Sequence, residues 1–414
     1  MIRDLLLAHG ADPVVATLRA YQRQALDDIA ACGTVASGMH WEACDQCGDR
    51  RMRPNTCGNR SCPHCQGRVR LAWVEARTQE LLPCGYFHVV LTLPPELRAA
   101  AQGFQAVVLG ALMRAATDAI DCLARDQRFL GAEVGQLAVL HTWTRDLRWH
   151  PHVHVIVTAG GLTADQRWKP AKTYGDRNRP FLVPVDVLKK AYAKRLQSLL
   201  LAAARAGAFA GHDGAPDGGG LAELASPDAL ARHLAIAMQR EWVVRIEPPF
   251  GGPQVLLRYL GAYVSRTAVG PKRVAFDREA GSATLTFTPN ATPGQAQTVT
   301  MPADEFIQRF AQHILPPRFQ RIRFRGLWST AHRATKLAVA RAALASSPPP
   351  PAESTPGALA TPPPGDCCTA CKLGHYQRLP GRCPRPQRHA RRTMLARIRA
   401  GDLHPTTPEA TTPA

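Results

Sequence analysis

Three histidines alternate with other residues in the segment RWHPHVHVIV, which covers residues 148–157. Alternate side chains of a β-strand point to the same face, and the β-branched residues that end this segment are typical of a strand. We therefore expect His150, His152 and His154 on one side of a strand. Imidazoles aligned in this way supply two or three ligands for a metal ion. The alternative is a polar strand face whose histidines bind no metal.

Two C-x2-C pairs, CDQC at 44–47 and CPHC at 62–65, follow each other in the N-terminal part of the chain. Each pair places two thiolates on one tight turn, and two such turns complete a tetrahedral zinc site. The pairing predicts one structural Zn2+ site with the ligands Cys44, Cys47, Cys62 and Cys65. Cys57 and His64 are alternative ligands in this cluster. Buried cysteines without a metal would not account for the paired spacing.

Arginines surround the two cysteine pairs, and we predict that this segment contacts DNA phosphates, with Arg60 and Arg68 among the contacting residues. A less regular cluster near the C-terminus is a candidate second zinc site, with the ligands Cys368, Cys371 and Cys383. Seven arginines between positions 382 and 399 indicate a phosphate-binding arm, although a solvated, disordered tail has the same composition.

Two tyrosines lie four positions apart in VLLRYLGAYVSR, which covers residues 255–266. The segment reads as a helix, in which residues i and i+4 share a face, so Tyr259 and Tyr263 would project together. Such a pair is often core packing. Here Arg258 and Arg266 flank the tyrosines and a candidate metal site already exists, which favours a role in binding and cleaving DNA.

A phenol has a pKa near 10 and is a poor nucleophile until a base or a charged site activates it. A divalent ion held by two imidazoles and one more polar ligand could polarise a phosphodiester. A tyrosine that attacks the phosphorus would leave a phosphotyrosine on one DNA end and a free hydroxyl on the other. Because the link conserves the phosphodiester energy, rejoining needs no ATP. Two tyrosines would allow two successive cleavages.

The elements that must position these groups follow from hydrophobic patterning. Residues 1–35 look helical, and from YFHVVLTLP (86–94) to about residue 340 strand-like and helix-like segments alternate, which indicates one α+β domain. We expect an N-terminal helical and zinc-binding segment at 1–80, a nuclease domain at 81–340, and a Pro-rich linker with a basic, cysteine-containing tail at 341–414.

The chain of 414 residues carries a net charge of +19, which predicts association with nucleic acid. No signal peptide and no apolar run long enough for a membrane helix is visible, so we expect a soluble protein without a membrane partner. In such a protein the 12 cysteines indicate metal binding and not a disulfide framework.

The order of FHVVLTLP, HPHVHVIV and Y-x3-Y resembles the three motifs of HUH endonucleases. The chain is most similar to the two-tyrosine transposases of rolling-circle bacterial insertion sequences. These proteins share the zinc segment CGNRSCPHCQ, HTW before the histidines, then PPFGGP, YLGAYVSR and EFIQRFAQHILPPRFQRIRFRGLW. The resemblance covers roughly residues 38–330. It implies an α+β fold with an HUH-type antiparallel sheet and flanking helices, after a small zinc-binding domain and before a disordered Pro-rich tail.

The resemblance implies that His152 and His154 hold Mg2+ or Mn2+, usually with a third polar ligand. His141 is our candidate, because AVLHTWTRDLRWHPHVHV reads as a hairpin that would bring it opposite the pair; His150 is the rival. The family usually has an asparagine shortly after the second tyrosine, where this chain has Gly270 and Pro271.

We therefore expect a bacterial, cytoplasmic and nucleoid-associated DNA transposase. It would nick and rejoin single-stranded element ends and target DNA through 5'-phosphotyrosine intermediates. A rolling-circle replication initiator or a relaxase with the same chemistry is the first alternative. The second is a zinc-containing DNA-binding regulator without catalysis, which would leave the histidines and tyrosines without a common purpose.

Overall fold

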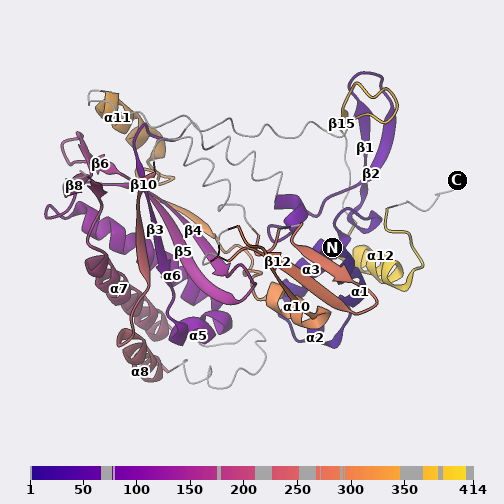
Figure 1. Ribbon diagram of the computed structural model, residues 1–414, viewed down its shortest axis with the longest axis horizontal. Coiled ribbons are helices and arrows are strands. Elements are labelled where there is room, and N and C mark those ends of the chain that lie inside the picture. The colour runs from indigo at the N-terminus through magenta and orange to yellow at the C-terminus, as the bar shows by residue number, and fades with distance from the viewer. Residues whose placement is uncertain are drawn as a thin grey trace.

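A five-stranded antiparallel sheet forms the centre of one half of the protein (Figure 1). The computed structural model describes residues 2–66, 77, 80–174, 179–209, 226–250, 267–270, 272–289, 292, 294–345, 367–380 and 386–406. The strand order is β10-β3-β5-β4-β14. The strands are β3 (Tyr86–Thr92), β4 (Gly135–Trp143), β5 (Trp149–Thr158), β10 (Val244–Phe250) and β14 (Ile322–Gly326).

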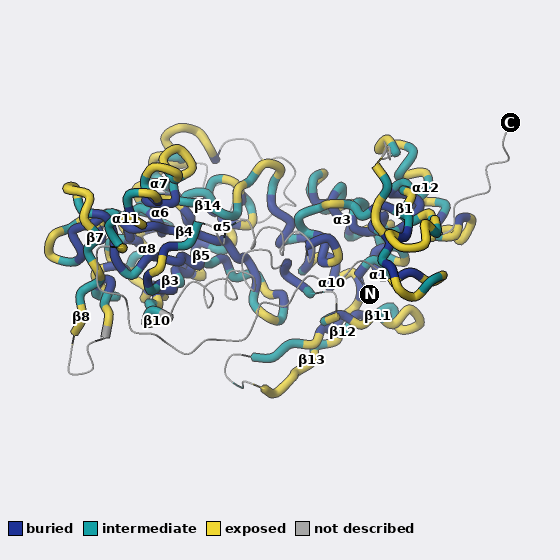
Figure 2. The backbone as a smooth tube through the Cα atoms, turned by 90° about the horizontal axis from the view of Figure 1, so that it is seen from above, coloured by how far each residue is buried: buried dark blue, intermediate teal, exposed yellow. Residues whose placement is uncertain are grey.

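Helices cover one face of this sheet. The layer consists of α5 (Arg98–Gly103), α6 (Gln105–Arg125), α7 (Val185–Arg205) and α8 (Pro227–Met238), with the short 3-10 turn η2 (Pro95–Leu97) before α5. Val153, Val155 and Val157 of β5 point to this layer and share its core with the apolar side of α6. β3, β4 and β5 are buried along most of their length (Figure 2). The predicted α+β fold with an antiparallel sheet and flanking helices is confirmed.

The opposite face of the sheet is covered at one end by α11 (Arg333–Ala345), whose Leu337 and Ala340 pack with Val139 and Ile156. Two small hairpins extend the same end of the domain. They are formed by β6 (Gly160–Leu162) with β7 (Trp168–Pro170), and by β8 (Lys172–Tyr174) with β9 (Arg179–Phe181).

A second core lies in the other half of the molecule (Figure 1). It begins with α1 (Ile2–His9), α2 (Pro13–Ala16), α3 (Ala20–Ala31) and η1 (Val35–Ser37). The sheet β11 (Val274–Asp277), β12 (Ser282–Phe287) and β13 (Gln297–Pro302) joins it, together with α10 (Ala303–Ala311) and α12 (Arg388–Ala400). All three segments that the sequence analysis delimits contribute residues to this core.

The β4–β5 hairpin connects the two cores. Trp143 and Leu147, at the end of β4 and in the turn, pack into the second core, whereas most of both strands belongs to the sheet. Leu147 has a φ of 65°, a left-handed conformation that is costly for a residue with a β-carbon. Because the Leu147 side chain is fully buried, apolar burial offsets this cost and fixes the turn.

Helix α12 carries several arginines of the basic tail, and some of them pair with carboxylates of the N-terminal segment. Leu395 and Ile398 of α12 are buried. Arg391 pairs with Asp28 of α3, and Arg399 lies 3.5 Å from the carboxylate of Asp27. These ion pairs and the apolar stripe hold the helix against the N-terminal segment.

None of the described helices is long and apolar enough to cross a membrane.

The N-terminal segment continues into the hairpin of β1 (Met39–Cys44) and β2 (Arg50–Pro54). A third strand, β15 (Tyr376–Arg378), pairs with β1 in antiparallel orientation, and Figure 1 shows it beside this hairpin. Residues from opposite ends of the chain therefore form one small sheet. The Pro-rich stretch between α11 and β15 lies outside the described residues.

Candidate functional site

Three histidines from the β4–β5 hairpin converge on one face of the central sheet. His141 of β4 lies directly opposite His152 of β5, and Val139 lies opposite His154. One nitrogen from each of the three rings lies within 4.8 Å of the others. Spacing of this kind suits coordination of a single ion by imidazole nitrogens.

The alternation of the strand explains this convergence. Val153 and Val155 take the face that packs on the helices, so His152 and His154 must take the other face. On the same face, towards the other end of the strands, Val139 and Ile156 are apolar and pack in the cluster that includes α11. The histidines therefore lie at the end of the sheet face beyond this apolar cluster.

Hydrogen bonds determine which nitrogen of each imidazole can bind a metal. Nδ1 of His152 lies 2.7 Å from the carbonyl oxygen of His150 and donates to it, because a carbonyl can only accept. In the neutral ring, Nε2 of His152 then carries the lone pair. Burial lowers the pKa of His152 to about 4, so this ring is neutral at physiological pH and keeps that lone pair.

A second hydrogen-bonded chain reaches the site from neighbouring strands. Nδ1 of His154 lies 2.8 Å from Nε2 of His88 on β3, and Nδ1 of His88 lies 2.7 Å from a carboxylate oxygen of Glu247 on β10. The carboxylate accepts from Nδ1 of His88, so Nε2 of His88 accepts from His154. Because Nδ1 of His154 donates, the lone pair of this ring lies on its Nε2 atom. Burial lowers the pKa of His88 despite the nearby carboxylate.

His88 and Glu247 are site residues that the sequence analysis misses. His88 stands in FHVV and Glu247 in RIEPPF, and neither segment contains a second residue that could be a metal ligand. The only signal is the strand register, because Glu247 lies opposite His88 across the β10–β3 pair. That register cannot be obtained from either segment alone.

His150, the rival for the third ligand, lies outside this group. Its Nδ1 atom accepts a hydrogen bond of 3.0 Å from the guanidinium of Arg98 on α5. Its backbone carbonyl orients His152. The structure thus brings His141, and not His150, together with the other two histidines.

Several predicted site residues lie outside the described part of the chain: Arg68, Arg258, Tyr259, Tyr263, Arg266 and Cys383. Arg60 is described, and its half-buried guanidinium donates to the carbonyl oxygens of Leu315, Pro316 and Phe319. It therefore ties the cysteine-rich segment to the loop before β14. The DNA contact of Arg60 stays a prediction.

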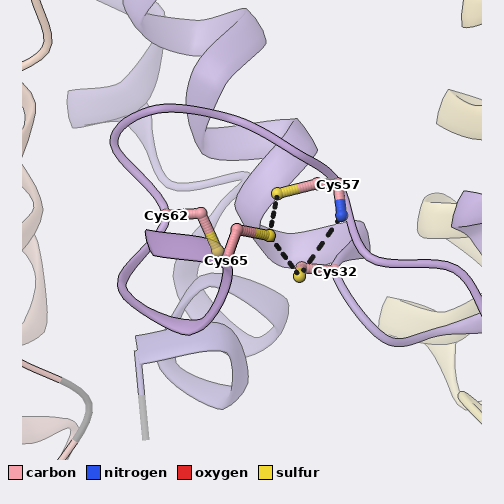
Figure 3. A group of neighbouring side chains, drawn as sticks. All are labelled: Cys32, Cys57, Cys62 and Cys65. Carbon is pink, nitrogen blue, oxygen red and sulfur yellow. Dashed lines mark hydrogen bonds between the residues drawn. The ribbon is translucent and has the colours of Figure 1, made fainter. Parts of the chain in front are cut away.

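Four cysteines of the N-terminal segment form one compact cluster (Figure 3). Cys32 lies at the end of α3, Cys57 follows β2, and the other two come from the CPHC turn. The Sγ atom of Cys65 lies 3.6 Å from that of Cys32 and 3.5 Å from that of Cys57. Backbone N–H groups of Cys57 and Gly58 point to sulfur atoms of the cluster, which stabilises thiolates. A four-thiolate set is typical of structural zinc.

The two C-x2-C pairs lie in different clusters. Cys44 and Cys47 stand at the tip of the β1–β2 hairpin with Cys368 and Cys371, whereas Cys62 and Cys65 lie near its base. The predicted single zinc site is therefore wrong in its grouping, because the hairpin separates the two turns by the length of its strands. Of the three tail cysteines predicted to share a site, Cys368 and Cys371 lie beside Cys44 and Cys47, and Cys383 lies outside the described residues.

Two family models match this chain. One, described as "Putative transposase", matches residues 135–336, and the other, described as "Transposase zinc-binding domain", matches residues 6–93. The chain is 39% identical over 345 residues to "Putative transposase y4qJ" of Sinorhizobium fredii (strain NBRC 101917 / NGR234), an alignment that covers 82% of each chain. The chain belongs to this transposase family.

A second relative of this transposase is "Transposase for insertion sequence element IS801" of Pseudomonas savastanoi pv. phaseolicola. The two chains are 27% identical over 320 residues, which is 75% of this transposase and 70% of the relative. No solved structure matches the transposase. The resemblance inferred from the motifs is confirmed, and it makes the protein a DNA-cleaving enzyme of transposition with DNA as its partner. The zinc-binding match supports Zn2+ as the metal of the cluster of Cys32, Cys57, Cys62 and Cys65.

Substitution of Cys32 tests which residues hold zinc in the N-terminal cluster. We expect Cys32→Ser to remove about one zinc ion per chain and to lower the thermal stability of the protein, because zinc binding contributes directly to folding. His64→Ala is the matched control, since His64 is exposed and lies outside the cluster. Elemental analysis of reduced, chelator-free protein measures the zinc content of both variants. Full zinc content in Cys32→Ser together with a loss in His64→Ala would contradict the assignment.

Proposed function

We propose that this transposase nicks and rejoins single-stranded DNA at the ends of its insertion sequence through 5'-phosphotyrosine intermediates. Mg2+ or Mn2+ would be held by His141, His152 and His154. The observation that carries the proposal is the convergence of these three rings from two paired strands. In a protein that acts on DNA, three such histidines could hold a metal ion beside a phosphodiester.

The hydrogen bonds of the rings support this metal site. Nδ1 of His152 and Nδ1 of His154 are both engaged, by a backbone carbonyl and by His88 respectively. Metal-bound histidines in proteins usually donate their second ring N–H in this way, which orients the ring and raises its basicity. Three nitrogen ligands would leave the remaining positions of a six-coordinate ion for water and phosphate oxygens. When bound, the ion would polarise the phosphoryl oxygens.

The described residues on either side of the tyrosine segment support the proposal. Glu247, a few residues before this segment, hydrogen-bonds to His88. Val269, a few residues after it, packs in the same core as Trp143, whose ring stacks on His141 with centroids 4.6 Å apart. One flank of this segment therefore contacts His88, and the other packs in the core that Trp143 shares.

In the proposed reaction the phenolic oxygen of Tyr259 or Tyr263 attacks the phosphorus of a DNA strand. The new bond joins the tyrosine oxygen to phosphorus, the bond from phosphorus to the 3' oxygen breaks, and that oxygen leaves as a 3'-hydroxyl after taking up a proton. Rejoining reverses these steps, because a 3'-hydroxyl attacks the phosphotyrosine and releases the phenol. Two tyrosines allow two strands to be held at once.

Substitution of the histidines tests the metal site. We expect His152→Ala and His154→Ala to reduce cleavage of labelled single-stranded element ends in Mn2+ by at least about 100-fold, because a metal ligand is lost. DNA binding in a gel-shift assay should remain, since phosphate contacts come mostly from Lys and Arg. His150→Ala is the matched control, because alanine keeps the backbone carbonyl that orients His152. Undiminished cleavage by both ligand variants would refute the site.

Substitution of Glu247 tests whether the hydrogen-bonded chain positions His154. We expect Glu247→Ala to weaken Mn2+ binding, followed by electron paramagnetic resonance, by about 10–100-fold. High Mn2+ should restore part of the cleavage activity, because no metal ligand is removed. Glu241→Ala is the control, since this exposed carboxylate contacts Lys189 and lies away from the histidines. Equal Mn2+ affinity in the two variants would exclude a positioning role.

Substitution of the tyrosines tests the nucleophile. Phenylalanine keeps the ring and lacks the hydroxyl, so Tyr259→Phe with Tyr263→Phe should bind DNA and form no covalent adduct. Each single variant should retain one adduct and lose most strand transfer. Tyr174→Phe, an exposed tyrosine in β8, is the control. Mass spectrometry of the trapped adduct identifies the residue, and a phosphotyrosine elsewhere would overturn the assignment.

A further inference from the structure

The second cysteine cluster is built from the two ends of the chain. Cys44 ends β1 and Cys47 stands in the turn after it, whereas Cys368 and Cys371 come from the segment before β15. Sγ of Cys44 lies 3.8 Å from Sγ of Cys371, and Sγ of Cys47 lies 3.7 Å from Sγ of Cys368. The match to the transposase zinc-binding domain, residues 6–93, includes only the first pair.

The separations of the sulfur atoms agree with tetrahedral zinc. A zinc–sulfur bond of roughly 2.3 Å gives a tetrahedron whose sulfur atoms are about 3.8 Å apart. All four Sγ atoms of the cluster lie within 4.8 Å of one another. A disulfide would require about 2.05 Å between two sulfur atoms, so neither close pair is one. The geometry is that of four ligands around one ion.

The turns around the cluster are shaped for sulfur ligands. The backbone N–H groups of Gln46 and Gly374 point to Sγ of Cys44 and Sγ of Cys371, at 3.4 Å in each case. A β-carbon on Gly374 would lie 2.5 Å from Sγ of Cys44, so only glycine lets the two turns approach this closely. The turn after Cys371 is thus shaped to approach Cys44.

Contacts between the two segments extend beyond the sulfur atoms. Cys44 lies opposite Tyr376 in the β1–β15 ladder, and Tyr376 donates a hydrogen bond to Asp49 in the hairpin turn. The guanidinium of Arg51 lies 3.6 Å above the ring of Tyr376. The apolar core here is very small, formed by Tyr376 and three of the cysteines. A module with so little apolar burial needs another source of stability, and a structural metal supplies it.

We propose that Cys44, Cys47, Cys368 and Cys371 hold a second zinc ion, which fastens the C-terminal segment to the N-terminal hairpin. Each C-x2-C pair supplies half of the ligands, so neither end of the chain binds this ion tightly alone. Thiolates must lose their protons to bind zinc, so the ion and the strand pairing stabilise each other. The site does not depend on the proposed cleavage chemistry.

Zinc content of the full-length protein tests the proposal. We expect two zinc ions per chain, and one in Cys47→Ala, in Cys371→Ala and in the double variant. Equal loss in all three follows only if both residues serve one ion. Cys367→Ala is the matched control, because this neighbouring cysteine lies outside the cluster, and it should retain two. Cys371→His should also retain two, because histidine is a zinc ligand.

Hydrogen exchange separates a shared site from local damage. In Cys371→Ala, amides of β1 should exchange faster, although β1 is far from the substitution in sequence, while the N-terminal cluster keeps its zinc and shows that the chain is folded. The proposal is overturned if Cys371→Ala retains two ions, if only Cys47→Ala loses one, or if β1 exchanges at the same rate in Cys371→Ala and Cys367→Ala.

Discussion

The antiparallel register of the central sheet is the constraint on which the rest of the structure depends. His141 faces His152 across β4 and β5, and Glu247 faces His88 across β10 and β3. Because side chains alternate, a shift of β5 by one residue would move its histidines under α6 and expose its valines. The buried valines therefore fix the position of the histidines more strongly than any contact that the imidazoles make themselves.

The turn between β4 and β5 transmits this constraint to the second core. Leu147 and Trp143 pack with α10 and the β11–β13 sheet, so the end of the hairpin that carries His141 is held from both sides. Arg60 adds another connection, because its guanidinium links the cysteine-rich segment to the loop before β14. The zinc-binding segment and the sheet that bears the histidines are thus joined by packing as well as by the chain.

Features set by local sequence could be predicted. The alternation in HPHVHV and the short loop before it were enough to place His141 opposite His152. Features set by long-range pairing could not be predicted. A C-x2-C motif identifies two ligands on one turn and says nothing about which turn completes the site. For this reason Cys32, which has no neighbouring cysteine, was missed, and Cys44 was assigned to the wrong partners. His88 and Glu247 depend on a strand register that neither segment reveals.

The separation of the two cysteine clusters along the chain has a consequence for biosynthesis. All four residues of the first cluster lie within positions 32–65, so that cluster can close early on the ribosome. The second cluster waits for Cys368 and Cys371, which emerge after the sheet, the histidines and the tyrosine segment have all been made. A ribosome that stops early would release a chain with the histidines and the tyrosine segment present and its small β1–β2–β15 sheet unfinished. Completion of this small sheet therefore requires that translation has passed β15.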